Sequence, residues 1–165
     1  MSETTLLIPK IESGIVIDHI PAGKGLEVLE IVHSYPEMRQ VVATVGLNYA
    51  SQKLGRKDML KLQTHSLPGR VMEHMAMVCA GVSIKRIENY KVVERLVVAV
   101  PDNIRGLARC RNPNCITNHE RDVQSRFRCI DPTSKRFACA FCEGIFGLHE
   151  LSVIVPVGEH LSARE

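Results

Sequence analysis

The chain has 165 residues, of which 45% are hydrophobic and 24% are charged, which is the composition of a soluble globular protein and excludes a fibrous one. Its net charge of +3 is too small to indicate a polyanion-binding protein by itself, and its longest apolar runs, such as residues 96–100, are too short to cross a bilayer. Residues 1–5 lack the basic segment of an export signal, so the six cysteines predict a reducing cytoplasm and metal binding rather than disulfides.

A strand and a helix are the first elements that the sequence predicts. Residues 14–20 are rich in β-branched side chains and lie before a proline, which is typical of a strand. Residues 25–32 predict a helix, because Leu26, Leu29 and Val32 recur at nearly helical spacing with acidic residues turned outward. We expect these three side chains to form one face of the helix.

Further elements follow before residue 101. The sequence predicts a strand, a polar loop and a one-sided strand over residues 40–47, 49–56 and 57–63. Pro68 suits the first turn of a second helix, on which Val71, Met75 and Val78 recur at helical spacing. The last two strands are expected on either side of a turn at Asn89-Tyr90, over residues 82–88 and 91–100.

The order of these elements indicates the fold class. A β-α-β-β-α-β order with one added strand predicts an α+β domain, a ferredoxin-like βαββαβ sandwich with two helices on one face of a mostly antiparallel sheet. Pro101-Asp102-Asn103 punctuates the chain, so we expect this domain to cover residues 1–101. Residues 102–165 contain all four phenylalanines and predict a small all-β domain of the zinc-ribbon or rubredoxin-like type, with a closing strand within 148–157.

Two cysteine pairs predict a metal site in the second domain. The pairs have C-x4-C and C-x2-C spacing and lie 23 residues apart: Cys110 with Cys115, and Cys139 with Cys142. Four thiolates around a tetrahedral Zn²⁺ make a structural site without an open position for a substrate water. Reduced unliganded cysteines and disulfides are the alternatives.

Other residues near the cysteine pairs are alternative metal ligands. His119 and His149 flank the pairs and could replace a cysteine, but four cysteines already complete a zinc site. Cys129 lies between the pairs and is expected to be a packed thiol rather than a spare ligand.

Few patterns suggest catalysis. The sequence has no P-loop, no G-x-S-x-G and no H-E-x-x-H motif. Asp18 and His19 could form an acid–base pair, but adjacent strand residues point to opposite faces, so a binding role is easier to build. Basic residues on three predicted strands could converge and receive phosphates, or form an ordinary charged face: Lys57, Lys61, Lys85, Arg86 and Arg95.

The charge of the chain is concentrated in the cysteine-containing region. Residues 103–142 carry eight Lys and Arg against three Asp and Glu, a net charge of +5. Such a basic finger could contact nucleic acid or an acidic protein surface, although a solvated charged face is the simpler interpretation. A zinc-ribbon nucleic-acid-binding protein is therefore the alternative function, and a free-standing nucleotide-binding enzyme is a weaker one.

Several collinear motifs carry a resemblance to a known family. They run from Gly14-Ile-Val-Ile-Asp-His-Ile-Pro21 through Gly46-Leu-Asn48, Gly55-Arg-Lys-Asp58 and Arg86-Ile-Glu-Asn-Tyr90 to Asn112-Pro-Asn-Cys-Ile116 and the second cysteine pair. Over residues 8 to 155 the chain resembles the regulatory chain of aspartate carbamoyltransferase. The resemblance implies a non-catalytic subunit of pyrimidine biosynthesis. In this family CTP, often with UTP, inhibits and ATP activates, regulatory chains form dimers, and a zinc domain docks on catalytic trimers.

The resemblance also implies which residues form the sites. The nucleotide site is expected to contain Ile11, Val16, Asp18, His19, Lys61, Ile87, Tyr90 and Val92. Lys85 and Arg95 stand where the family has an asparagine and a lysine, and both suit phosphate. Residues that match positions facing the catalytic chain are Asn112, Asn114 and Glu143, whereas Gly144 replaces a lysine of enterobacterial members. No contact with nucleic acid or a membrane is implied.

Overall fold

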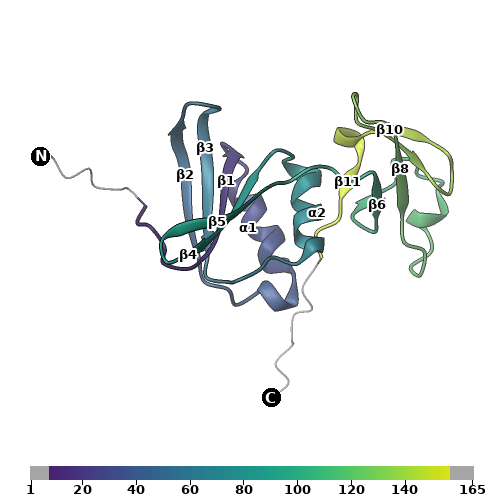
Figure 1. The fold of residues 1–165 in the computed structure, drawn as a ribbon. Coiled ribbons are helices and arrows are strands. Elements are labelled where there is room, and N and C mark those ends of the chain that lie inside the picture. The colour runs from purple at the N-terminus through teal and green to yellow at the C-terminus, as the bar shows by residue number, and fades with distance from the viewer. Residues whose placement is uncertain (1–7, 157–165) are drawn as a thin grey trace, which may run out of the picture. The chain divides into compact units, whose positions relative to one another are not determined.

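The computed structural model describes residues 8–156, which fall into two compact units that divide after Ala99. The first unit contains, in chain order, β1 (Gly14–Pro21), α1 (Gly25–Ser34), η1 (Pro36–Met38), β2 (Ala43–Ser51), β3 (Gly55–Leu62), α2 (Gly69–Val78), β4 (Ser83–Glu88) and β5 (Lys91–Val97). Its five strands form one sheet in the order β2-β3-β1-β4-β5, and each neighbouring pair is antiparallel. Both helices lie on the same face of this sheet (Figure 1). The predicted ferredoxin-like sandwich is confirmed, with β5 as the added edge strand.

The core of the first unit lies between the helices and one face of the sheet. Ile15 and Ile17 on β1, and Leu60 and Leu62 on β3, alternate with residues that face the other way, as a strand period of two requires. These side chains are nearly or fully buried, together with Val71, Met75 and Cys79 at α2. The other face of the sheet is therefore left without helices and is available for a ligand.

The predicted face of the first helix is right only in part, because Leu29 packs against the core and Val32 is buried but Leu26 is not. Leu26 is 60% exposed, and the buried face of α1 consists of Val28, Ile31 and Val32. These residues continue to Tyr35 at spacings of three and four, so they form a longer apolar stripe than the predicted one. The longer stripe buries more apolar surface and decides how the helix is turned.

The predicted polar loop over residues 49–56 is also wrong in most of its length. The strands β2 and β3 continue into it and pair as far as Ser51 and Gly55. Backbone hydrogen bonds hold such a hairpin without apolar side chains, so the polar composition hid two strand ends. The turn predicted at Asn89-Tyr90 is found, and both residues have positive φ, 49° and 64°.

The second unit consists of short strands and two single 3₁₀ turns. Its elements are β6 (Asn103–Arg105), β7 (Ala108–Arg109), η2 (Ile116–Asn118), β8 (Arg126–Asp131), β9 (Arg136–Cys139), β10 (Ile145–Gly147), η3 (Leu148–Glu150) and β11 (Ser152–Val153). They form a four-stranded sheet, β10-β9-β8-β6, and a two-stranded sheet, β11-β7. Phe127 and Phe137 are each 2% exposed and make the small core with Ile104 and Leu107. The predicted all-β type is confirmed.

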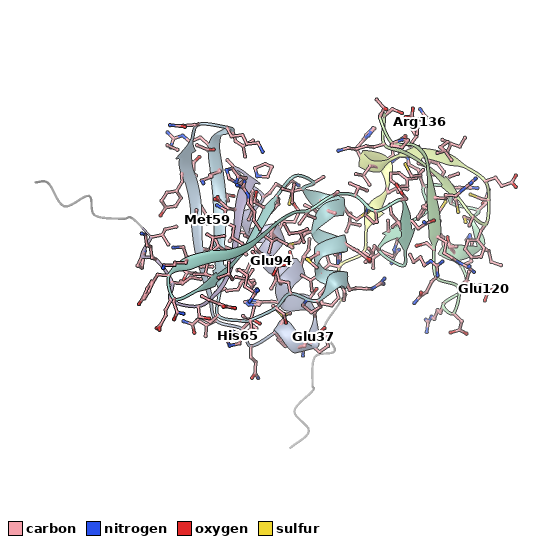
Figure 2. All side chains as sticks on the ribbon, viewed as in Figure 1. Glu37, Met59, His65, Glu94, Glu120 and Arg136 are labelled. Carbon is pink, nitrogen blue, oxygen red and sulfur yellow. The ribbon has the colours of Figure 1, made fainter. Side chains whose placement is uncertain are left out.

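Figure 2 shows the described side chains as sticks on the ribbon of each unit. The closing strand expected within 148–157 is only the two-residue β11, and residue 157 lies outside the described residues. In residues 8–156 no helix is long and apolar enough to span a bilayer.

Candidate metal centre and ligand pocket

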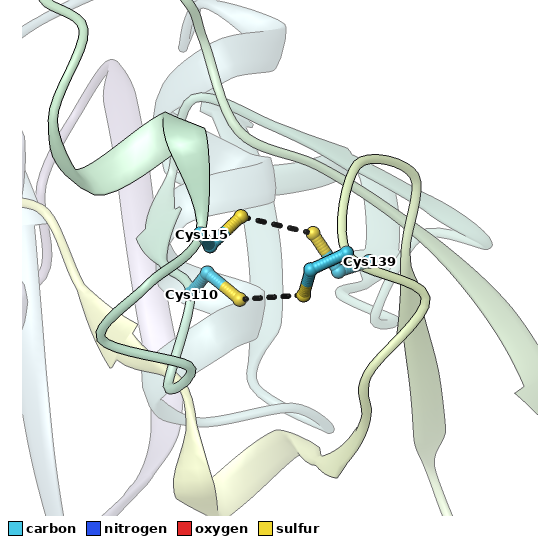
Figure 3. Close-up of side chains that lie close together, drawn as sticks. Cys110, Cys115 and Cys139 are labelled. Carbon is cyan, nitrogen blue, oxygen red and sulfur yellow. Dashed lines mark hydrogen bonds between the residues drawn. The ribbon is translucent and has the colours of Figure 1, made fainter.

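The four predicted metal ligands come together in the second unit. Cys110 follows β7, Cys115 precedes η2, Cys139 ends β9, and Cys142 lies in the turn before β10. The sulfur of Cys110 is 3.6 Å from that of Cys142, and the sulfur of Cys115 is 3.8 Å from that of Cys139. Figure 3 shows the two sulfur pairs facing one another across a small space.

The spacing of the sulfur atoms fits zinc. A tetrahedron with Zn–S bonds of about 2.3 Å has sulfur–sulfur edges of about 3.8 Å. The four sulfur atoms all lie within 4.8 Å of one another, and two of their separations, 3.6 Å and 3.8 Å, are close to the ideal edge. Four sulfur ligands complete the coordination, so the centre is a structural zinc site and leaves no position for a substrate.

The residues considered as alternative ligands lie outside this cluster, as expected. The Nε2 atom of His119 lies 2.7 Å from the carbonyl oxygen of Pro113, and neither His119 nor His149 belongs to the cysteine group. Cys129 is half-buried on β8 and is also outside the group. Its backbone N–H donates to the carbonyl of Asp102.

Backbone turns hold the two cysteine pairs in place. The N–H of Cys115 donates to the carbonyl of Asn112 at 3.0 Å, and the amide of Asn118 donates to the carbonyls of Cys110 and Asn112. On the other side, the N–H of Cys139 donates to the carbonyl of Gly144 at 2.9 Å. The local sequence thus shapes two loops whose thiols point inward.

Three of the thiols have shifted pKa values. Burial raises the pKa values of Cys110 and Cys139 above the ordinary range. Burial also opposes ionisation of Cys142, but hydrogen bonds, first among them that of the Gly144 N–H, lower the pKa of Cys142 to about 7. Metal binding has to ionise the buried thiols, and zinc supplies the positive charge that does so.

The predicted interface residues surround the metal loops. The side-chain oxygen of Asn112 accepts the N–H of Asn114 at 3.0 Å, so Asn112 also shapes the first loop. Asn114 and Glu143 are exposed. Their contact with a partner remains a prediction.

The first unit has a cavity of about 550 Å³ on the sheet face that carries no helices. Eight of the ten predicted nucleotide-site residues line it: Ile11, Val16, Asp18, Lys61, Lys85, Ile87, Tyr90 and Val92. His19 and Arg95 do not. The antiparallel register explains the convergence, because Val16 on β1 lies directly between Lys61 on β3 and Lys85 on β4.

Asp18 is the centre of charge at this cavity. It is 5% exposed, and its two carboxylate oxygens lie 2.7 Å from the Nζ atom of Lys57 and 2.9 Å from the Nζ atom of Lys85. The backbone N–H of His19 also donates to it, at 2.7 Å. Burial opposes ionisation of Asp18, but these hydrogen bonds outweigh it and hold the pKa of Asp18 well below its usual range.

The expectation that Asp18 and His19 point apart is wrong. A bulge in β1 places two residues, Asp18 and His19, opposite the single residue Met59 of β3. His19 takes a positive φ of 61°, and its Nδ1 atom lies 3.7 Å from the Asp18 carboxylate. Burial, with the nearby lysines, lowers the pKa of His19 despite that carboxylate, so the imidazole is neutral near pH 7.

Four lining residues were not among the predicted site residues: Ile8, Lys10, Tyr49 and Met59. Met59 shares its face of β3 with Lys61, so strict alternation from Lys61 would have found it. Tyr49 follows a bulge in β2 at Asn48, which has a φ of 62°, and no sequence pattern marks that shift. Ile8 and Lys10 lie in the irregular segment before β1, where periodicity gives no signal.

The basic residues that were expected to converge on one sheet face do not all reach the cavity. Lys61 lines the cavity, and its ammonium group donates to the carbonyl of Pro9. Arg86 follows Lys85 on β4, so it points to the other face of the sheet and does not line the cavity. There it forms ion pairs with Glu88 and Glu94. Arg95 lies opposite Lys85 in the register and contacts Ser83 at 3.4 Å.

The turn between β4 and β5 forms part of the rim of the cavity. The N–H of Tyr90 donates to the carbonyl of Glu12 at 3.0 Å, which ties the turn to the segment before β1. The Tyr90 side chain is 59% exposed and lines the cavity with Ile11 and Ile87. The lining of the cavity therefore combines apolar and aromatic side chains with ammonium groups.

Both units match domains of one known protein family. Residues 6–99 match the family described as aspartate carbamoyltransferase regulatory chain, allosteric domain, and residues 102–152 match its metal binding domain. Among similar proteins are the aspartate carbamoyltransferase regulatory chains of Pyrococcus abyssi (42% identical; 84% of this chain and 90% of the relative) and Thermococcus sibiricus (41%; 84% and 89%). That of Methanothermobacter thermautotrophicus is 36% identical, over 88% of this chain and 92% of the relative.

Proposed function

The chain belongs to the family of aspartate carbamoyltransferase regulatory chains, a non-catalytic subunit with an allosteric and a metal-binding domain, and from this premise we propose its effectors and contacts. CTP or UTP binds in the cavity of the first unit and inhibits the catalytic chains, and ATP binds there and activates them. The metal-binding unit docks on catalytic trimers. Regulatory chains pair as dimers that link two trimers.

The observation that carries the nucleotide proposal is that one cavity is lined by both apolar and cationic side chains. Ile11, Ile87 and Tyr90 offer apolar surface to a base. Lys10, Lys61 and Lys85 supply three ammonium groups on the same cavity, which suit a polyphosphate.

Asp18 is suited to a second task at this cavity. Its carboxylate is fixed by two lysines and is ready to accept hydrogen bonds from ribose hydroxyls or an amino group. His19 and Arg95 lie outside the lining, and their predicted roles require contact with the far end of the nucleotide. Arg95 faces the same side of the sheet as Lys85, so it suits an extended phosphate chain.

The sheet edge supports the proposed dimer. Every residue of β5 is exposed, including Val92, Val93, Leu96 and Val97, each between 46% and 56%. An exposed apolar edge strand is a liability that proteins cover with another chain. A second regulatory chain would cover it.

The metal-binding unit supports docking and a cytoplasmic location. Asn114 and Glu143 are exposed in the zinc loops, and Asn112 is half-buried in the first loop, where they can contact a catalytic chain. The thiolates must stay reduced to hold zinc, which suits the cytoplasm.

The rival function, nucleic-acid binding, has less support. Aromatic rings that stack on bases have to be exposed. Phe127 and Phe137 are buried, and the guanidinium group of Arg126 lies 5.3 Å from the ring centre of Phe141. The basic finger thus lacks a free stacking platform among these rings.

Co-assembly tests the proposal. The zinc-loaded chain is mixed with the catalytic trimer of the same organism, mass is followed by light scattering, and activity is assayed with and without CTP and ATP. We expect a large, zinc-dependent complex whose activity responds to both nucleotides. A complex without a nucleotide response would contradict the effector site, and the absence of a complex would contradict the docking role.

A further inference from the structure

The metal-binding unit has a hollow on the sheet face opposite its phenylalanine core. It has a volume of about 460 Å³ and lies over β6, β8 and β9. Arg105, Arg126 and Arg128 line it with Asn103, Ala138 and Ala140. These six residues are called the arginine face below.

The arginine face brings like charges together. In the register of β6 and β8, Arg105 lies directly opposite Arg126, and Asn103 lies opposite Arg128. Like charges that face each other across strands destabilise a sheet. Among the described residues, neither Arg126 nor Arg128 has a carboxylate within 4.0 Å. An anionic partner could therefore pair with the charges of these two arginines.

The floor of the hollow is made of small side chains. Ala138 lies opposite Arg128, and the N–H of Ala140 donates to the carbonyl of Arg126 at 2.8 Å. Their methyl groups leave room between the longer arginine side chains. Arg126 and Arg128 stand two residues apart on one strand, which is about 7 Å, and carboxylates at alternate positions of an extended segment have the same spacing. Guanidinium groups bind carboxylates through two parallel hydrogen bonds.

We propose that the arginine face docks an extended acidic segment of the catalytic chain, with carboxylates on alternate residues. This inference rests on the proposed function and adds a second contact beside the zinc loops. Glu143 also lines the hollow and would repel a carboxylate there, so the acidic residues lie over the arginines of β8. The face does not suit bases, because Phe141, which is 36% exposed, is already covered by Arg126.

The test compares Arg128→Gln with Arg121→Gln in the full-length, zinc-loaded chain. The Arg128 side chain forms no hydrogen bond or ion pair with the described residues, and Arg121 is an exposed arginine of the same unit outside the hollow. The affinity of each variant for the catalytic trimer is measured at several salt concentrations. We expect Arg128→Gln to weaken assembly by about tenfold, with a smaller dependence on salt, because one charge-assisted contact is lost. Arg121→Gln should match the wild type, and zinc content should not change.

The outcomes separate this inference from the proposed function. Assembly of the wild type with equal affinities for both variants would overturn the arginine face and leave the docking role intact. A wild type that fails to assemble would overturn the docking role, and this inference with it. Loss of binding to a single-stranded oligonucleotide in Arg128→Gln, with unchanged assembly, would assign the face to nucleic acid instead.

Discussion

The carboxylate of Asp18 lies 2.9 Å from the ammonium group of Lys85, although the two residues are 67 positions apart in the chain. Lys57 completes the arrangement from the opposite side, at 2.7 Å. The lysine side chains are 23% and 16% exposed, against 6% for that of Asp18. One buried negative charge therefore joins β1, β3 and β4 beneath the cavity.

Replacement of Asp18 should destabilise the first unit. In Asp18→Asn, Lys57 and Lys85 lose their common counter-charge while remaining partly buried. We expect the free energy of unfolding to fall by about 2–4 kcal/mol in urea denaturation followed by circular dichroism. Glu27→Gln, which removes the exposed pair with Lys24, is the control and should change it by less than about 0.5 kcal/mol. Equal stability of Asp18→Asn and wild type would contradict the role of Asp18.

The contribution of Asp18 should depend on pH in one direction. Because the pKa of Asp18 is lower in the folded than in the unfolded chain, the unfolded chain binds more protons in acid. The stabilisation contributed by Asp18 is complete above the ordinary aspartate pKa of about 4. It is lost as the pH falls toward the lower pKa that Asp18 has in the folded chain. Between about pH 5 and pH 7, the difference in melting temperature between wild type and Asp18→Asn should be constant. Below about pH 4 this difference should shrink. A difference that grows in acid would show that the sign is wrong.

Loss of one zinc ligand should abolish metal retention. Cys115 is 1% exposed and lies 3.8 Å from Cys139, so a serine leaves the metal with three thiolates. We expect Cys115→Ser to lose zinc during purification and to fail to assemble, as measured by metal analysis and light scattering. Cys129→Ser is the matched control, because Cys129 is outside the cluster. Normal assembly of Cys115→Ser would refute the structural role of the metal.

Lys61 should contribute to effector binding without affecting the metal. Its side chain lines the cavity opposite Lys85, and its loss removes one ammonium group from a phosphate. We expect Lys61→Ala to weaken CTP and ATP binding by about tenfold in calorimetric titration, with unchanged zinc content. Lys53→Ala, in the exposed β2–β3 turn, should bind both nucleotides normally. Unchanged affinity in Lys61→Ala would remove Lys61 from the site.

Much of the fold was predictable because its signals are local. Proline and glycine positions and short apolar periods gave the order of strands and helices, and the order gave the ferredoxin-like sandwich. The prediction that Leu26 belongs to the buried face of α1 was wrong because two apolar stripes overlap on that helix. Only packing in the folded chain selects the stripe through Val28 and Ile31. The prediction of a loop at the polar hairpin ends of β2 and β3 was wrong because pairing between backbones leaves no signal in the composition.

The sequence by itself determined the metal centre, because cysteine spacing within two tight loops restricts where the thiols can point. It also determined the family, because several motifs recur in the same order. Only the tertiary structure decided that Lys57 and Lys85 share Asp18, that a bulge turns His19 toward the same carboxylate, and that Arg105 faces Arg126. These contacts depend on strand register and on single-residue bulges, which are fixed by packing and backbone pairing between distant segments rather than by any local pattern.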